Sequence, residues 1–472
     1  MPRNPQKKGK KKRAAPGDGG ASSSGAAAAG DVDMEGGAAP SGAAPAERPK
    51  VWRAGVDDMA GDEELQFDPT AYDCLHALAL EWPCLSFDVV RDSLGEQRSA
   101  FPHTLYGVAG TQAGSAGGNS LAVMKLGNLT RMRRPRGGDD EDDEDEGSSS
   151  DEEEAGGAAA PVLQVRMVAH HGGVNRVRAM PQQPHIAATW GETGHVQVWD
   201  VSPQLRELAA LPATAATAAS PVVRQAPLHV FSGHATEGFA MDWSPVTPAR
   251  LATGDCAGQI HVWEPREGGG WAVGGAPFRG HSSSVEDLQW SPGEAGVFAS
   301  ASCDKRIAVW DTRQPDRPAL SVPAHAADVN VLSWNRLASC MLASGADDGT
   351  FRIWDLRAFQ EDAFVAHFKY HGAPITSLEW SAHDSSALAV AAADNQLTLW
   401  DLSLEADAEE ERHWAAAQAQ PQAEAPPDLP AQLLFVHQGQ HDLKELHWHP
   451  QVPGLLVSTA ADGFNVFKAS NL

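Results

Sequence analysis

The sequence predicts an all-β fold built from repeated four-stranded units. The clearest unit, residues 281–311, holds short runs of β-branched and aromatic residues separated by turn residues such as Ser291-Pro292. Runs of this kind are typical of antiparallel strands. A histidine stands 29 residues before the tryptophan that closes the unit (310 − 281), and this spacing occurs five times along the chain. The pairs are His170 and Trp199, His234 and Trp263, His281 and Trp310, His325 and Trp354, and His371 and Trp400.

Two further observations bring the number of units to seven. A second tryptophan follows the histidine by nine residues in four of the five units, and a sixth, looser unit ends at Phe467. In the sixth unit Trp448 takes the inner position, and either His437 or His441 is the opening histidine. Residues 105–108 and 121–124 have strand character and indicate one more unit, which lacks a WD ending.

By its period and its Gly-His and Trp-Asp signature, the repeat resembles the WD-repeat family. The resemblance implies a seven-bladed β-propeller, whose four-stranded sheets pack radially and leave only short edges exposed. It also implies that each repeat histidine has a structural role, bonded to a turn aspartate and a tryptophan of its own blade. Asp304, Asp348 and Asp394 lie six residues before the WD tryptophan and suit this role. The His170 and His234 units have Thr193 and Ala257 there, with Glu192 and Asp255 nearby as substitutes.

Composition narrows the remaining functions. The chain has 472 residues and a formal net charge of −26, which suits one propeller with extensions. No run approaches the roughly 18 apolar residues of a membrane span, and the five cysteines form no CxxC pair, as expected of a reduced intracellular protein. The sequence lacks the common phosphate-binding and hydrolase motifs, and its tightest histidine cluster is His447-Trp448-His449. We expect no catalysis, cofactor, metal or small-molecule ligand, and a monomeric propeller.

The first 50 residues are rich in Ala, Gly, Ser and Pro. Such a segment buries too little apolar surface to offset the entropy of ordering, so we expect it to be disordered. A basic cluster near its start fits a nuclear or nucleolar import signal, and the alternative is a solvated basic tail. The cluster consists of Lys7, Lys8, Lys10, Lys11, Lys12 and Arg13.

Residues 51–82 are expected to form an N-terminal segment and a helix that precede a propeller over residues 83–472. Asp68 is a good N-cap, Pro69 suits the first helical position, and Pro83 would end the helix. The strand that follows, residues 84–90, is expected to pair near the C-terminal unit at residues 455–467. This stretch resembles the first helix and strand of the histone-binding WD proteins. The resemblance implies a histone-helix site, and the alternative is a helix that only covers a blade edge. The site would consist of Tyr72, Leu75, Leu78 and Trp82.

The insertion at residues 131–160 carries the strongest charge. A like-charge block repels itself and stays disordered, and it can attract a basic protein and compete with nucleic acid for it. The alternative is a solubilising loop. Phosphorylation of residues 148–150 would deepen the charge. Residues 205–228 and 404–431 are two further insertions, both expected to be surface loops. The acidic residues are Asp139, Asp140, Glu141, Asp142, Asp143, Glu144, Asp145, Glu146, Asp151, Glu152, Glu153 and Glu154.

Beyond the repeat signature, the chain resembles the glutamate-rich WD-repeat family of eukaryotes. The resemblance lies in PCLSFDVVRD at residues 83–92, GHATEGFAMDWSP at residues 233–245, and FVHQGQHDLKELHWHPQVPGLLVSTA at residues 435–460. It implies a nuclear and nucleolar protein of large-subunit ribosome assembly, which acts on pre-ribosomal particles. The family is expected to act as a chaperone for a basic ribosomal protein, large-subunit ribosomal protein three.

Two alternatives remain open. One is a chromatin factor that handles histones, which the residue 72–82 segment suggests. The other is a substrate receptor that binds the adaptor of a cullin-based ubiquitin ligase. Arg313 and Arg357 fit the WDxR pattern of such receptors. Arginine after WD is, however, common in these repeats, where it can pair with a neighbouring blade.

Overall fold

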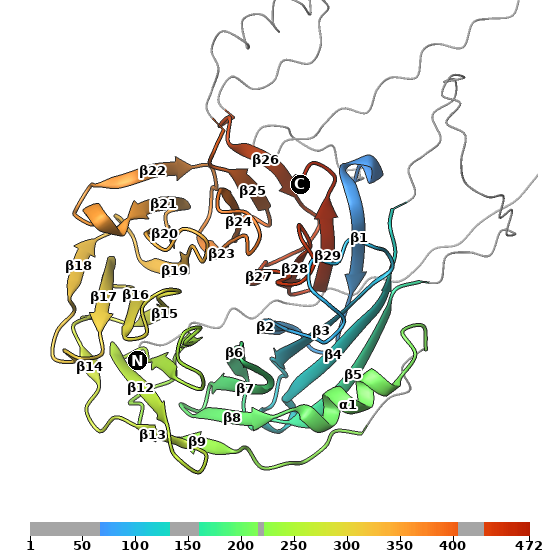
Figure 1. Cartoon of the computed structure of the whole chain (residues 1–472), viewed down its shortest axis with the longest axis horizontal. Coiled ribbons are helices and arrows are strands. Elements are labelled where there is room, and N and C mark those ends of the chain that lie inside the picture. Colours follow the sequence, from blue (N-terminus) through green and yellow to red (C-terminus); the bar gives the residue numbers. More distant parts are fainter. Residues whose placement is uncertain (1–66, 133–159, 216–220, 405–428) are drawn as a thin grey trace, which may run out of the picture. The chain divides into compact units, whose positions relative to one another are not determined.

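The computed structural model describes residues 67–132, 160–215, 221–404 and 429–472. These residues belong to one compact unit, residues 67–472. Its sheets follow one another around a common centre (Figure 1). The described strands form seven antiparallel sheets, six with four strands and one with five, so the predicted seven-bladed propeller is confirmed. The basic cluster at residues 7–13, the acidic residues 139–154 and residues 405–428 lie outside the described residues.

The first four blades follow chain order from β2 to β18. Blade one contains β2 (Cys84–Val90), β3 (His103–Thr111), β4 (Ser120–Leu129) and β5 (Val162–Ala169). Blade two contains β6 (Val174–Met180), β7 (Gln183–Gly191), β8 (Val196–Asp200) and β9 (His229–Phe231). Blade three contains β10 (Ala240–Trp243), β11 (Leu251–Gly254), β12 (Gln259–Pro265), β13 (Trp271–Val273) and β14 (Phe278–Arg279). Blade four contains β15 (Val285–Trp290), β16 (Val297–Ser302), β17 (Arg306–Asp311) and β18 (Leu320–Pro323).

The last three blades complete the ring. Blade five contains β19 (Val329–Trp334), β20 (Met341–Ala346), β21 (Thr350–Asp355) and β22 (Phe364–Lys369). Blade six contains β23 (Ile375–Trp380), β24 (Ala387–Ala392), β25 (Leu397–Asp401) and β26 (Leu433–His437). Blade seven contains β27 (Glu445–Trp448), β28 (Leu456–Ala460), β29 (Gly463–Ala469) and β1 (Tyr72–Leu78). Short 3₁₀ helices are η1 (Pro69–Ala71), η2 (Ala116–Gly118) and η3 (Leu356–Ala358).

The segment before β2 is a strand, so the expected helix is wrong. Asp68 does cap a helical turn, since its side chain accepts from the Thr70 amide at 2.8 Å, but that turn is only the three-residue η1. The chain then extends as β1, which pairs with β29 and places Leu75 opposite Phe467. The free edge of β29 offers a full ladder of hydrogen bonds, which outweighs the local helix propensity of the Leu- and Ala-rich segment.

Ring closure therefore differs from the prediction. A terminal segment does complete the last blade, but the segment is β1 rather than residues 84–90. Those residues form β2, the innermost strand of blade one, and pair with β3. The propeller thus begins with β1, upstream of residue 83.

The core lies between successive blades, where the repeat tryptophans pack. The largest fully buried side chains include Trp190, Trp263, Trp310, Trp354 and Trp400. Aromatic side chains of this size contribute most of the apolar area that a core buries. Four of the five are the WD tryptophans found from the spacing, so the sequence repeat and the packing repeat coincide.

The insertion at residues 205–228 is partly helical, which corrects its assignment as a loop. α1 (Ser202–Ala210) begins with Pro203 in its first turn and buries Leu208 fully. The Lys125 ammonium, from the buried face of β4, donates to the carbonyls of Leu208 at 3.1 Å and Leu211 at 2.6 Å. A cation at a helix C-terminus satisfies orphan carbonyls and complements the helix dipole. No described helix is long and apolar enough to cross a membrane.

Candidate functional site

Carboxylates of the innermost strands join neighbouring blades around the centre of the propeller. Asp88 accepts from the Ala179 amide at 2.8 Å, which links blades one and two. The same contact links later blades, from Asp242 to the Trp290 amide, from Asp287 to the Leu332 amide and from Glu379 to the Trp448 amide. We call these side chains, together with Glu445, the channel clasp. The clasp fastens each blade to the next through charge-assisted hydrogen bonds.

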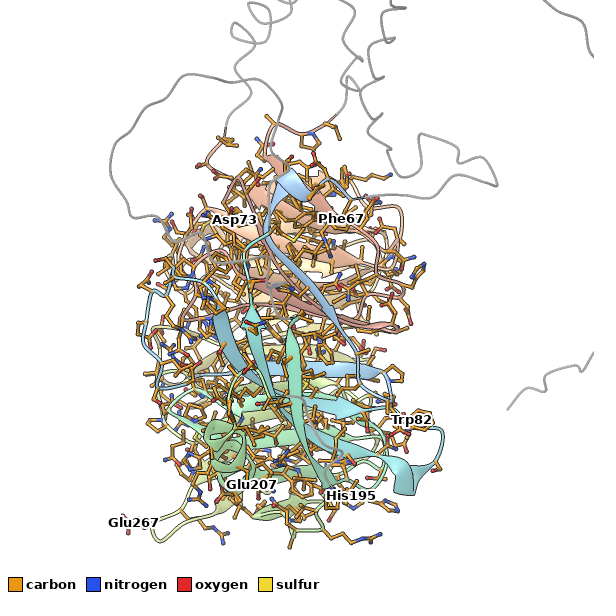
Figure 2. The ribbon with its side chains drawn as sticks, turned by 90° about the vertical axis from the view of Figure 1, so that its right-hand side faces the viewer. Phe67, Asp73, Trp82, His195, Glu207 and Glu267 are labelled. Atoms are coloured by element: carbon orange, nitrogen blue, oxygen red, sulfur yellow. The ribbon has the colours of Figure 1, made fainter. Side chains whose placement is uncertain are left out.

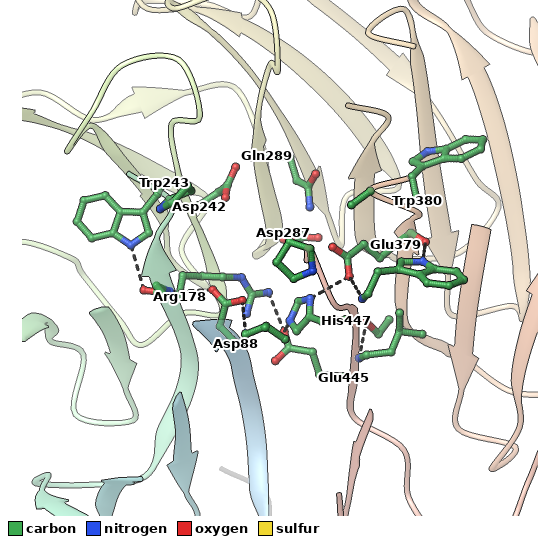
Figure 3. A pocket seen from close by; sticks show the side chains of 18 of the residues that line it. Asp88, Arg178, Asp242, Trp243, Asp287, Gln289, Glu379, Trp380, Glu445 and His447 are labelled. Carbon is green, nitrogen blue, oxygen red and sulfur yellow. Dashed lines mark hydrogen bonds and ion pairs between the residues drawn. The ribbon is translucent and has the colours of Figure 1, made fainter. Parts of the chain in front are cut away.

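Glu445 of β27 closes the clasp where the two ends of the propeller meet. It is 1% exposed and accepts from the Phe87 amide and the Ser86 hydroxyl, both at 2.8 Å. Arg176 and Arg178 each approach its Oε1 at 2.7 Å. One buried carboxylate therefore binds blades seven, one and two together (Figure 3).

Charge within the clasp is set by burial and by ion pairs. Burial opposes ionisation of Glu445, but Arg178 and Arg176 outweigh it and hold the pKa of Glu445 well below its usual value. His447 lies beside it, with Nδ1 at 3.0 Å from Glu379 and Nε2 at 3.7 Å from Glu445. Burial disfavours its charge, yet these two carboxylates raise the pKa of His447 to about 10. Both groups are therefore ionised at neutral pH.

A second recurring arrangement surrounds the repeat histidines. In blade four His281 Nδ1 lies 2.9 Å from Asp304, and Nε2 lies 2.7 Å from the Ser300 hydroxyl. The Trp310 indole donates to the same hydroxyl at 2.8 Å. Histidine and tryptophan are thus connected through a hydroxyl, which the spacing argument did not include. The pattern recurs with His234, Thr253, Trp263 and Asp255, and with His371, Thr398, Trp400 and Asp394.

Two blades depart from the expected aspartate contact. His325 Nδ1 contacts the Thr350 hydroxyl at 3.1 Å, and Asp348 accepts from that hydroxyl at 2.6 Å. The expected direct bond between Asp348 and His325 is therefore replaced by a bond through Thr350. His170 Nδ1 contacts the Gly172 carbonyl at 2.9 Å instead of Glu192.

Blade seven resolves the choice of histidine differently from the other blades. His437 is buried in β26 of blade six, where its Nδ1 lies 2.8 Å from the Tyr72 hydroxyl and its ring stacks on Phe467 at 4.2 Å. Burial lowers the pKa of His437 to about 4, so it is neutral at pH 7. His441 is exposed and lies 3.3 Å from Asp462. The opening position of the blade thus belongs to His441, while His437 supports the β1 contact.

The four residues expected to share a helix face do not share one, because they lie on β1 and the turn after it. Tyr72 is buried, and Leu75 and Leu78 are half-buried. Trp82 follows the strand in the connection to β2, where it is 40% exposed at one rim of the propeller (Figure 2). A histone-helix site built from one face of a helix is therefore not present at residues 72–82.

Arg313 and Arg357 lie at matching positions of blades four and five. Their side chains are 82% and 75% exposed, and each folds back onto the aspartate of its own WD pair, with Nε at 2.9 Å from Asp311 and Asp355 respectively. Neither shows an ion pair to a neighbouring blade among the described residues. Both guanidinium groups are accessible from outside the propeller.

The stem of the acidic insertion is fastened to β1. The Met132 amide donates to the Asp73 carbonyl at 2.8 Å, and the Arg131 guanidinium lies 3.4 Å from the Asp73 carboxylate. His76 Nε2 contacts the Thr130 carbonyl at 3.0 Å. The insertion therefore leaves the propeller beside the strand that closes the ring.

Sequence reasoning missed the clasp, although its residues are visible in the sequence. His447-Trp448-His449 stood out as a histidine cluster, and the structure places His447 in ion pairs. Among the described residues no group of three or more His, Cys, Asp or Glu could hold a metal ion. The available signal was a polar residue between apolar ones on inner strands, such as Asp287 in VEDLQW and Glu379 in ITSLEW.

Comparison with known proteins agrees with this architecture. The family model "WD domain, G-beta repeat" matches residues 275–311, 317–355 and 363–401. The family model of the histone-binding protein RBBP4 and its counterpart in the CAF1 complex matches residues 62–130. The solved WD40 β-propeller domain of Doa1 superimposes with a TM-score of 0.51 at 13% identity, covering 85% of this chain and 97% of that chain. The fold and repeats thus define a WD-repeat propeller.

Relatives along almost the whole chain give the particular family. "Protein HEAT STRESS TOLERANT DWD 1" of Arabidopsis thaliana is 56% identical over 92% of this chain and 94% of its own length. "Glutamate-rich WD repeat-containing protein 1" of Dictyostelium discoideum is 50% identical, with coverage of 89% and 85%. "Ribosome assembly protein rrb1" of Schizosaccharomyces pombe is 42% identical, with coverage of 86% and 82%. The chain belongs to the family of glutamate-rich WD-repeat proteins and the Rrb1 ribosome assembly protein.

Proposed function

We propose that this chain is a non-enzymatic assembly factor for the large ribosomal subunit in the nucleus and nucleolus. The observation that carries the proposal is 42% identity, over 86% of this chain, to the fission-yeast protein named ribosome assembly protein rrb1. Its partners are pre-ribosomal particles and one basic ribosomal protein, for which we propose large-subunit ribosomal protein three. The basic cluster at residues 7–13 serves as the import signal.

The proposed mechanism is capture and charge shielding. The propeller grips one segment of the basic client, and the acidic residues 139–154 cover its remaining positive charge until it reaches RNA. Opposite charge accelerates encounter and adds an affinity that falls as salt rises. The stem contacts between Met132 and Asp73 would hold the acidic insertion beside blades one and seven.

A charge-neutral variant tests the shielding step. The twelve acidic residues between 139 and 154 are changed to Asn or Gln, so the length of the insertion is unchanged. We expect the purified variant to leave the client aggregating with RNA and to show a weaker salt dependence of binding. The matched control exchanges Asp for Glu and Glu for Asp at the same positions, which keeps the charge. Unchanged client solubility and salt dependence in the neutral variant would rule out shielding.

A histone-binding chromatin function is the second candidate. It is favoured by the histone-binding family model at residues 62–130. A relative from fission yeast named "Histone acetyltransferase type B subunit 2" is 27% identical over 46% of this chain. The test offers a core histone and the ribosomal protein together, the first with DNA and the second with RNA. Preference for the histone by orders of magnitude would reverse the ranking of the two functions.

A ubiquitin-ligase receptor function is an additional candidate, favoured by the accessible Arg313 and Arg357 on adjacent blades. We propose that these side chains contact the adaptor of a cullin-based ligase. The double change Arg313→Ala and Arg357→Ala should abolish adaptor capture. Arg317→Ala is the matched control, because Arg317 is an arginine a few residues beyond Arg313 that lies outside the WDxR pattern. Equal capture by the double variant and the control would exclude this role.

A further inference from the structure

The channel clasp surrounds a cavity that none of the functions above uses. The cavity measures about 140 Å³ and is lined by inner-strand residues of several blades, including Asp242, Asp287, Gln289 and Trp380 (Figure 3). One water molecule needs roughly 10–15 Å³ by this measure. The space is therefore sufficient for the end of a long side chain.

Two carboxylates of this cavity lack the cation that the rest of the clasp has. Asp242 accepts the Trp290 amide at 2.8 Å through Oδ2, and no described hydrogen bond uses its Oδ1. Asp287 is 5% exposed and accepts only backbone amides, from Leu288 and Leu332. Neither forms an ion pair within the described part of the chain, in contrast to Glu445 with its two arginines.

The electrostatic consequence is a cavity that favours positive charge. Burial, together with the neighbouring Asp287, raises the pKa of Asp242 to about 7. A buried carboxylate without a cation is costly, and a cation placed between the two would stabilise the ionised form. The cavity's own buried cations, Arg176, Arg178 and His447, are already bound to Glu445 and Glu379.

An independent observation comes from hydrogen-bond donors in the same lining. The inner tryptophans Trp290 and Trp448 donate their indole Nε1 to the preceding blade, at 3.0 Å and 2.9 Å. Trp380 is 5% exposed, and its Nε1 has no described partner. The Thr376 hydroxyl, in the same lining, also has none. Buried donors of this kind usually have an acceptor, and a peptide carbonyl would supply one.

We propose that this cavity binds an arginine side chain of an extended basic peptide, with the guanidinium between Asp242 and Asp287 and a peptide carbonyl at the Trp380 indole. A guanidinium suits two carboxylates because its planar donors form several directed hydrogen bonds at once. The inference rests on the proposed function for the basic character of the partner. Arg336 lies exposed in the cavity lining and forms no described ion pair, so it opposes the incoming charge.

The test titrates the full chain with the blocked tripeptide Gly-Arg-Gly, and follows the Trp380 indole N–H by NMR. The matched probe is Gly-citrulline-Gly, which has the same shape without the charge. We expect the arginine peptide to shift the Trp380 signal and the citrulline peptide to leave it in place. Asp242→Asn should weaken binding at least about tenfold, as expected for loss of a charge-assisted hydrogen bond. Arg336→Gln should strengthen it.

Glu294→Gln is the control variant, because Glu294 is an exposed carboxylate outside this cavity. Should Asp242→Asn unfold the protein, Trp380→Phe keeps an aromatic ring, removes the N–H and should still weaken binding. The site is excluded when the arginine peptide leaves the Trp380 signal unmoved, or when Asp242→Asn binds as tightly as Glu294→Gln. If the ribosomal protein is still captured in either of those cases, the proposed function stands and only the cavity assignment fails.

Discussion

Replacing Glu445 by Gln should destabilise the propeller more than any other single change in the channel clasp. The carboxylate is 1% exposed and receives four hydrogen bonds, from Ser86, Phe87, Arg176 and Arg178. A glutamine keeps one acceptor oxygen, but it removes the charge that two partly buried arginines face. Removal of one partner from a buried ion pair typically costs about 3–5 kcal/mol.

Solvent reduces this figure somewhat, because the side chains of Arg176 and Arg178 remain 18% and 16% exposed. We therefore expect a loss of about 3 kcal/mol in the free energy of unfolding, measured by urea denaturation at pH 7. Hydrogen exchange should accelerate first in β2, β6 and β27, which Glu445 joins. Glu294→Gln, an exposed charge loss, should change stability by less than about 0.5 kcal/mol. A loss below about 1 kcal/mol in Glu445→Gln would refute the claim that this carboxylate holds the ring.

The contacts of the clasp, the repeat histidines and α1 each give one more prediction. His447 has a folded pKa of about 10 against roughly 6.5 unfolded, so its contribution is complete below pH 6.5 and is lost as pH rises through 10. His447→Gln should flatten the stability profile in that window, and an unchanged slope would contradict the assignment. Ser300→Ala leaves the Trp310 indole and His281 without their shared partner and should cost about 1–3 kcal/mol by urea denaturation, whereas a neutral result would show that water replaces the hydroxyl. Lys125→Met should speed hydrogen exchange in α1, since two carbonyls lose their donor; Lys305→Met is the control, and equal exchange in both would exclude the capping role.

The repeats could be predicted from sequence because their signals are local. His281, Ser300, Asp304 and Trp310 interact within one blade, so their spacing is fixed by the strand lengths and appears directly in the sequence. The direct contact expected for Asp348 failed for an equally local reason, since the hydroxyl of Thr350 lies between the carboxylate and the histidine.

The ring closure could not be predicted from local pattern. β1 carries Leu and Ala, which suit a helix, and its partner lies near residue 467 at the other end of the chain. The contacts of Glu445 with Phe87 and Arg178 likewise join residues far apart in sequence. A single sequence shows that such residues are polar and flanked by apolar ones, but it does not show which of them meet. The role of the acidic residues 139–154 stays a prediction, since they lie outside the described residues.

The central claim is that this protein holds one basic ribosomal protein specifically. The most direct measurement is purification of the tagged full-length chain from growing cells at low and high salt, with identification and quantification of bound proteins. The account predicts one large-subunit ribosomal protein at near-equal stoichiometry that survives high salt, because the propeller contributes contacts beyond charge. Histones alone, or a mixture of basic proteins that washes away at high salt, would contradict it.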